Sequence, residues 1–195
     1  MRILVVGAGA TGGYFGGRLA QAGRDVTFLV RPKRAAQLQA DGLQILSPHG
    51  DVTLTPKLVT ADAIAAPYDA VLLTVKAFAL EAALRDLVPA VGADSMIIPV
   101  LNGMRHVDAL TKRFGEGPVL GGVCLVASTI DPQGRIRQLA DFQQFVYGER
   151  SGEMSARVTA LDAAMQGGGF VARASGAILQ EMWEKWILLA TLGAI

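Results

Sequence analysis

The sequence predicts an α/β fold with a doubly wound, mostly parallel sheet. Short apolar runs, such as residues 3–6 and 70–75, alternate with helical patterns through the first two-thirds of the chain. This order is typical of parallel strands joined by crossover helices. Apolar residues make up 51% of the 195 residues, because parallel strands buried on both faces read as continuous apolar runs.

The first strand, expected over residues 3–6, is followed directly by a glycine motif and then by a helix expected over residues 10–22. In a Gly-x-Gly-x-x-Gly motif, Gly7 allows the tight turn, Gly9 lets a pyrophosphate approach the backbone, and Gly12 lets helix and strand pack closely. Free N–H groups at the helix start attract phosphate. The sequence therefore predicts a Rossmann-type dinucleotide site formed by Gly7, Ala8, Gly9, Ala10, Thr11 and Gly12.

The second strand, residues 25–30, ends in a basic segment that begins with Arg31. Folds that prefer NAD usually carry a carboxylate near this point, but none occurs between Arg31 and Asp41. A guanidinium binds a 2′-phosphate through paired hydrogen bonds. We therefore expect NADP as the cofactor, with Lys33 or Arg34 as further contacts. The alternative is a solvated basic loop.

The remaining elements follow the same alternation. Residues 43–46 and 52–55 read as a hairpin appended to the parallel sheet. The other elements expected are a helix over 33–40, a strand over 70–75, a helix over 78–88, a strand over 96–101, a helix over 107–114, a strand over 119–128, short strands over 135–139 and 144–147, a helix over 153–165, a short strand over 170–172 and a final helix over 177–192.

Two polar residues follow strands of the predicted sheet. Lys76 comes after strand 70–75 and Asn102 after strand 96–101. Ligands of open parallel sheets lie beyond the carboxyl ends of the strands, so both side chains are candidates for the cofactor crevice. The alternatives are a solvated lysine at a helix start and a turn asparagine before Gly103.

Lys185 lies on the final helix, on one face with Ile178, Met182 and Leu189. Because this helix is apolar nearly all round, we expect it to be buried. A lysine in such surroundings is costly unless it is paired, and it is a natural proton donor or oxyanion stabiliser. The alternative is a salt bridge with Glu181, one turn earlier.

Composition excludes several classes of function. A net charge of +1 gives no electrostatic basis for binding nucleic acid. No apolar segment approaches the ~20 residues that span a bilayer, and no secretory signal precedes the first strand. A single cysteine, Cys124, in an apolar run fits a core residue and a reducing compartment. His49 and His106 show no metal-binding spacing. We expect a soluble, cytoplasmic protein without a metal site.

Several motifs together resemble those of the ketopantoate reductases (2-dehydropantoate 2-reductases), in the right order over essentially the whole chain: Gly7 to Gly12, Arg31, Thr74-Val75-Lys76-Ala77, Leu101-Asn102-Gly103-Met104 and Glu181-Met182-Trp183-Glu184-Lys185. The resemblance implies hydride transfer from NADPH to a small-molecule 2-oxo acid substrate, giving a 2-hydroxy acid, in pantothenate and coenzyme A synthesis. It also implies that Lys185 donates a proton to the carbonyl and that Asn102 contacts cofactor and substrate. Lys76 and the backbone at Ala127 would contact NADP.

The chain departs from the family pattern at two positions. Members carry asparagines four and eight residues after the catalytic lysine, where this chain has Leu189 and Gly193. Because those amides help to hold ketopantoate, the substrate is expected to differ or to bind less well.

The resemblance also divides the chain into an NADP-binding domain, residues 1–173, and the first helix of a helical substrate domain, residues 174–195. The family's helical domain is longer, so we expect this chain to be a fragment. An uncovered apolar flank on that helix favours association, for example as a homodimer. The alternatives to a 2-oxo acid reductase are a non-catalytic NADP-binding module and an opine-type dehydrogenase that joins an amine to a keto acid.

Overall fold

The strand that precedes the glycine motif and four later strands form one parallel sheet. The structure, a computed structural model, describes residues 1–193. This first sheet has the strand order β5-β2-β1-β6-β7 and comprises β1 (Arg2–Val6), β2 (Asp25–Leu29), β5 (Lys57–Val59), β6 (Ala70–Leu73) and β7 (Met96–Pro99). The order reverses between β1 and β6, and the crevice beyond the carboxyl ends there is where such sheets bind ligands.

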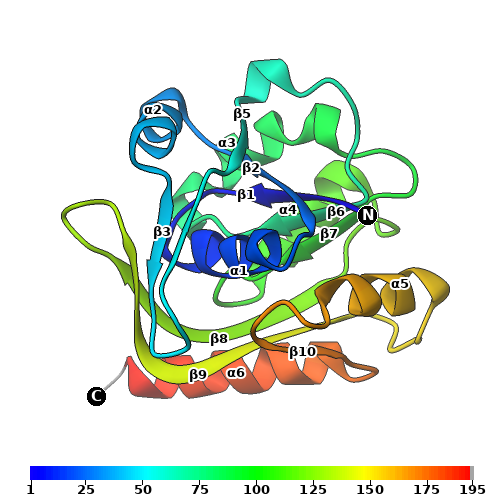
Figure 1. The fold of residues 1–195 in the computed structure, drawn as a ribbon. Helices are drawn as coiled ribbons and strands as arrows, with labels where there is room; N and C mark the ends of the chain where they lie inside the picture. The colour runs from blue at the N-terminus through cyan, green and yellow to red at the C-terminus, as the bar shows by residue number, and fades with distance from the viewer. Residues whose placement is uncertain (194–195) are drawn as a thin grey trace.

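Helices cover both faces of the first sheet (Figure 1). On one face, α1 (Ala10–Gln21) packs against a buried cluster that includes Val5 and Phe28. On the other face, α3 (Leu80–Asp86) and α4 (Arg105–Phe114) contribute to a second buried cluster. The predicted doubly wound α/β fold is therefore confirmed. Another helix, α2 (Pro32–Asp41), follows β2 of the first sheet.

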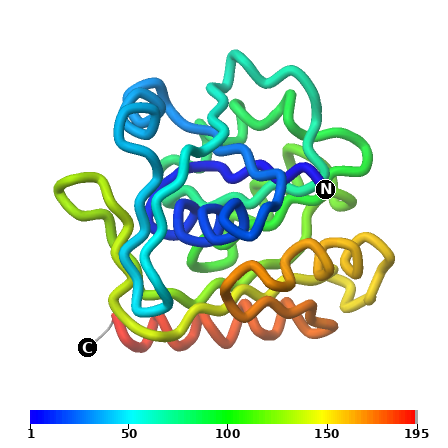
Figure 2. The backbone as a smooth tube through the Cα atoms, viewed as in Figure 1, coloured from blue at the N-terminus to red at the C-terminus, as the bar shows by residue number. Residues whose placement is uncertain are grey.

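A second sheet lies on the far side of α1, so that the helix is enclosed between two sheets (Figure 2). Its strands are β3 (Leu43–Leu46), β4 (Val52–Leu54), β8 (Gly121–Ile130), β9 (Ile136–Gly148) and β10 (Val171–Ala174). The predicted hairpin exists as β3–β4, but its placement in the parallel sheet is wrong, because β3 pairs with β9 instead. The short strand predicted over 170–172 also joins β9, as β10.

The glycines of α1 explain how a helix fits between two sheets. A Cβ atom on Gly16 would lie 2.7 Å from the ring of Phe28 in the first sheet, and one on Gly17 would lie 2.7 Å from Ile45 and Leu43 in the second. Glycine lowers the helix propensity of this segment. Close packing on both sides, rather than intrinsic propensity, therefore holds α1 in place.

Several predicted elements have different boundaries in the structure. The two short strands of 135–147 are one bulged strand, because Val126 of β8 pairs with Gln143 and Ser128 pairs with Gln138. The predicted helix 78–88 is a short α3 between two 3-10 turns, Ala77–Ala79 and Val88–Ala90. The helix predicted from residue 153 begins later, as α5 (Ala156–Met165), after the capping residue Ser155. The edge strand β5 was not predicted.

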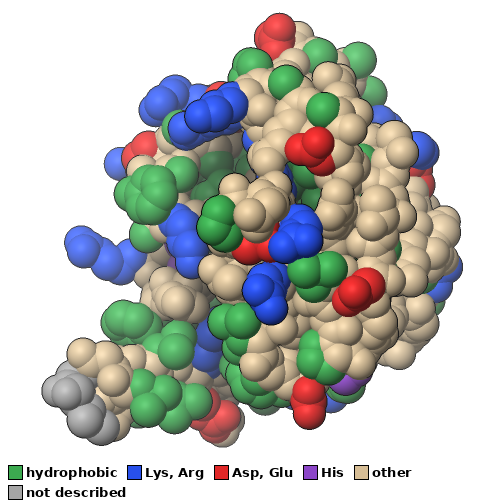
Figure 3. Space-filling view, turned by 60° about the vertical axis from the view of Figure 1, so that its left-hand side comes forward, with side chains coloured by type: hydrophobic (Ala, Val, Ile, Leu, Met, Phe, Trp, Pro, Cys, Tyr) green, Lys and Arg blue, Asp and Glu red, His purple; other side chains and the backbone are tan. Residues whose placement is uncertain are grey.

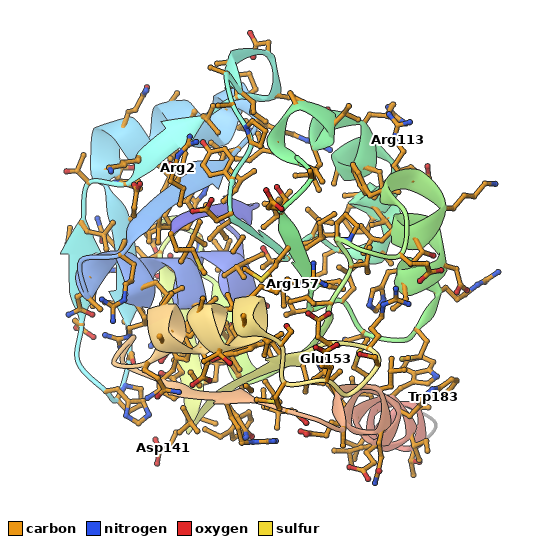
Figure 4. The ribbon with its side chains drawn as sticks, turned by 90° about the vertical axis from the view of Figure 1, so that its right-hand side faces the viewer. Arg2, Arg113, Asp141, Glu153, Arg157 and Trp183 are labelled. Carbon is orange, nitrogen blue, oxygen red and sulfur yellow. The ribbon has the colours of Figure 1, made fainter. Side chains whose placement is uncertain are left out.

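The last helix, α6 (Ile178–Leu192), packs on the outer face of the second sheet (Figure 1). Ile178 and Met182 are buried against it, and a Cβ atom on Gly121 would lie 2.7 Å from Ile178. The prediction that the whole helix is buried is wrong, because several large apolar side chains are exposed: Leu179, Trp183, Trp186, Ile187, Leu188 and Leu192. Hydrophobic side chains gather at the lower left of Figure 3, and Trp183 lies at the molecular edge in Figure 4.

Among residues 1–193, no helix combines the length and apolar character that crossing a membrane requires. The same residues include no group of three or more histidine, cysteine, aspartate or glutamate side chains placed to hold a metal ion.

Candidate functional site

The glycine-rich loop leaves the carboxyl end of β1 in a tight, fixed turn. Gly7 has a φ of 95°, a left-handed conformation that favours glycine, and its N–H donates to Leu29 O at 2.9 Å. The Thr74 hydroxyl donates to Val6 O at 2.8 Å and lies 3.2 Å from Gly7 O. A Cβ atom on Gly12 would lie 2.2 Å from both Gly7 O and Thr74 Oγ1. Gly7 and Gly12 therefore serve the close packing of loop, helix and strand.

Gly9 has different surroundings from the other two glycines of the motif. A Cβ atom placed on Gly9 would meet no heavy atom within 4 Å beyond its own helix and chain neighbours. Gly9 is the N-cap of α1 without a side-chain cap, and its carbonyl accepts from Gly13 N–H at 2.7 Å. Within the described residues, the N–H groups of Ala10 and Thr11 have no acceptor. Open space before free N–H groups at a helix N-terminus fits a pyrophosphate.

The basic residues after β2 differ in their exposure and in their hydrogen-bond partners. Arg31, the N-cap of α2, and Lys33 are exposed, and neither side chain forms a hydrogen bond or ion pair with the residues that the structure describes. Arg34 is partly buried, and its guanidinium donates to Ala8 O in the glycine loop and to Gly134 O in the β8–β9 turn. Arg31 and Lys33 are therefore available to a phosphate group, whereas Arg34 is largely occupied by backbone carbonyls.

Lys185 and Asn102 come together although they are far apart in the sequence. Both line one small pocket between α6, β8 and the loop after β7, with Leu101, Gly103, Gly122, Val123, Met182 and Trp186. Lys185 is partly buried and Asn102 is exposed. Gly103 has a φ of 80°, and a Cβ atom on it would lie 3.9 Å from the Trp186 ring. The pocket therefore combines an ammonium group, an amide and an indole ring.

The predicted alternative for Lys185, a salt bridge with Glu181, does not occur among the described residues. Glu181 pairs instead with Arg173, and it also accepts a hydrogen bond from Ser175. Burial alone would raise the pKa of the Glu181 carboxyl, but these two partners lower it below its ordinary value. The ammonium group of Lys185 is thus not neutralised by Glu181.

Lys76 and Ala127 lie outside the lining of this pocket. Lys76 is exposed and follows β6 as the N-cap of a 3-10 turn. Ala127 lies in β8 where the pairing with β9 shifts register, between Val126 and Ser128. Leu189 is partly buried one turn after Lys185, and Gly193 caps the end of α6.

His106 is a feature of the site region that the sequence did not single out. It lies in the first turn of α4, is only 4% exposed, and its Nε2 has no hydrogen-bond partner among the described residues. Burial, and secondarily the Lys185 ammonium, lower the pKa of His106 to about 4, against a smaller opposing effect of Asp108. The sequence feature that could have placed His106 near the site is its position four residues after Asn102.

Cys124 is buried as predicted, and burial raises the pKa of its thiol.

Comparison with known proteins is consistent with this geometry. The family profile described as ketopantoate reductase PanE/ApbA matches residues 3–152. The chain is 42% identical to a Bacillus subtilis (strain 168) protein named uncharacterized oxidoreductase YkpB, over 100% of the chain and 64% of that protein. It is 32% identical to a 2-dehydropantoate 2-reductase of Mesorhizobium japonicum, over 95% of the chain and 63% of the relative.

Solved structures agree in fold. The crystal structure of 2-dehydropantoate 2-reductase from Geobacter metallireducens GS-15 superposes with a TM-score of 0.85 at 31% identity, covering 95% of this chain and 61% of the other. The chain therefore spans less than two thirds of the length of these relatives. Since the family profile covers most of its residues, the chain belongs to the ketopantoate reductase family.

Proposed function

We propose that the protein carrying this chain reduces a small 2-oxo acid with NADPH as its cofactor. The observation that carries the proposal is the shared pocket of Lys185 and Asn102 beside the carboxyl edge of the first sheet. In this proposal residues 1–173 form the NADP-binding domain and residues 174–195 the first helix of the substrate domain. The names of the relatives, 2-dehydropantoate 2-reductases, support the reaction class.

The cofactor would be held along the carboxyl edge of the first sheet. The N–H groups at the start of α1 would bind the pyrophosphate in the open space before Gly9. Arg31 would bind the 2′-phosphate, with Lys33 nearby, which is the basis for proposing NADPH rather than NADH. Lys76 and the backbone at Ala127 would provide further contacts. When bound, NADPH supplies the hydride that reduces the carbonyl carbon.

The chain's own groups would handle the carbonyl oxygen. The ammonium of Lys185 would donate a hydrogen bond to this oxygen and then transfer its proton, so that no free alkoxide is released. The amide of Asn102 would orient the same carbonyl. Because the buried side chain of Met182 forms one apolar wall of the pocket, the interaction of the ammonium with developing negative charge would be stronger there than in bulk water.

The side chains of α6 favour a substrate other than ketopantoate, or a weaker hold on it. Leu189 and Gly193 offer no hydrogen-bonding side chain at the two positions where the family carries asparagine. A polar substrate group left unpaired there costs about 1–3 kcal/mol. If ketopantoate is nevertheless the substrate, the reaction belongs to pantothenate and coenzyme A synthesis. We place the enzyme in the cytoplasm.

A spectrophotometric assay of the whole protein tests the proposal. NADPH or NADH is mixed with a panel of 2-oxo acids, 2-dehydropantoate included, with and without an amine co-substrate. We expect oxidation of NADPH in preference to NADH, with a 2-oxo acid alone. A requirement for the amine would show an opine-type dehydrogenase, and binding of NADPH without any oxidation would show a non-catalytic module.

A further inference from the structure

We infer that Arg34 is a positioning residue for the nucleotide site, one that orients the peptide between Ala8 and Gly9 so that the Gly9 N–H faces the bound pyrophosphate. This inference rests on the proposed function, since it assumes that a dinucleotide occupies the glycine loop. It differs from the expectation raised by the basic segment itself, in which Arg34 would contact the 2′-phosphate directly.

The guanidinium of Arg34 is held on both of its edges. Nε and Nη2 donate to Ala8 O at 3.3 and 3.2 Å, while Nη1 donates to Gln37 Oε1 at 2.7 Å and to Gly134 O at 3.1 Å. An arginine side chain has five N–H donors, and four are used here, one from Nε, two from Nη1 and one from Nη2. Arg34 is therefore poorly placed to grip a phosphate with paired hydrogen bonds.

The contact with Ala8 O determines the direction of the next N–H group. In a trans peptide, the carbonyl of one residue and the N–H of the following residue point to opposite sides, and the described residues contain no cis peptide bond. Because Arg34 holds Ala8 O on its side of the loop, the Gly9 N–H points away from Arg34. The structure records no acceptor for this N–H among the described residues, and the space beside Gly9 is open.

The opposite orientation of this peptide would disfavour an anionic ligand. A carbonyl oxygen turned toward the pyrophosphate would present partial negative charge to it, and it would remove one of the N–H donors on which such loops depend. A bidentate guanidinium resists this flip more effectively than a lysine, because its planar fork fixes both donors at once. Arg34 therefore holds the peptide between Ala8 and Gly9 in the orientation that favours an anion, before the nucleotide binds.

The turn between β8 and β9 completes this support. Gly134 of the turn approaches so closely that a Cβ atom on it would lie 2.0 Å from Gln37 Nε2 and 3.1 Å from Arg34 Nη1. Gln37 also donates to Gln133 O at 3.3 Å. The second sheet thus helps to hold Arg34 in position against the glycine loop, which gives its β8–β9 turn a role in nucleotide binding.

The test compares Arg34→Gln with Arg24→Gln in the whole protein, by measuring the dissociation constants of NADPH and NADH. Arg24 is a matched control, because its guanidinium also donates to two backbone carbonyls, Ala164 O and Gln166 O at 2.8 Å each, away from the glycine loop. We expect Arg34→Gln to weaken both nucleotides by the same factor, about tenfold for one lost hydrogen bond. Arg24→Gln should change neither by more than about twofold.

A loss confined to NADPH would overturn the inference, since it would show a direct contact with the 2′-phosphate. Unchanged affinity for both nucleotides would overturn it as well. If Arg34→Gln does not fold, Arg34→Lys provides the same comparison, because one ammonium cannot bridge Ala8 O and Gly134 O as a fork does. Wild-type protein that binds neither nucleotide would instead refute the proposed function, and the inference with it.

Discussion

Arg31 and Arg34 show how much of a site is decided by neighbours that lie far away in the sequence. Both follow the second strand and both were candidates for phosphate binding. Arg31 is exposed, whereas Arg34 is engaged by Ala8 O and Gly134 O. The local pattern predicted the basic character of this segment correctly. It could not distinguish the two roles, because Gly134 comes from the turn of the second sheet, about a hundred residues further along the chain.

His106 gives the clearest pH dependence at the scale of one residue. Its pKa in the folded protein is about 4, below the ordinary value of 6.5. Between these values the unfolded chain binds the proton and the folded protein does not, so stability is complete above pH 6.5 and falls as the pH decreases toward 4. A shift of this size corresponds to about 3 kcal/mol.

Chemical denaturation at pH 7 and at pH 4 tests this prediction with wild type and His106→Gln. The wild-type free energy of unfolding should fall by about 3 kcal/mol more than that of the variant, because carboxylates such as Glu149 and Glu181 contribute equally in both proteins. The same loss in both proteins would show that folding does not lower the pKa of His106.

At the scale of elements, most strands of both sheets were predictable as segments, but the pairing that places β3, β4 and β10 in a second sheet was not. Residues 3–6 and 70–73 are apolar throughout, because α1 covers one face and α3 and α4 cover the other. In contrast, β3 lies beside β9 only because the chain returns after residue 136, and no local pattern records that pairing. The short edge strand β5 has too few apolar residues for a strand signal.

The position of α1 between the sheets makes a prediction for Gly16. In an isolated helix, alanine is more favourable than glycine by about 1 kcal/mol. Here a Cβ atom on Gly16 would lie 2.7 Å from Phe28 and 2.9 Å from Val5, both fully buried. We expect Gly16→Ala to lower the free energy of unfolding by about 1–3 kcal/mol, as overpacking does.

Thermal and denaturant unfolding measure the effect of Gly16→Ala, and Gly117→Ala is the control. A Cβ atom on Gly117 would meet nothing within 4 Å, so this variant should unfold like wild type within about 0.5 kcal/mol. If Gly16→Ala proved more stable than wild type, the close packing of α1 on the first sheet would be contradicted.

On the scale of the whole molecule, the fold brings together Lys185 and Asn102, which sequence patterns identified as candidates for separate reasons. Lys185 was singled out because a lysine on an apolar helix is unusual, and Asn102 because it follows a strand of the parallel sheet. Only the packing of α6 on β8 brings them into one pocket. An uncovered flank on this helix was expected from the sequence, but Trp183 and Ile187 could not be identified as exposed, because an apolar sequence does not reveal what covers it.

The assignment of Lys185 as proton donor makes the most direct test a comparison of Lys185→Ala with Lys112→Ala in the whole protein. Lys112 is an exposed lysine in the last turn of α4. With the best 2-oxo acid substrate, Lys185→Ala should lower kcat by at least about a hundredfold, as expected when a general acid is lost. The dissociation constant of NADPH should change by less than about twofold, and Lys112→Ala should behave as wild type. Undiminished turnover by Lys185→Ala would contradict the account.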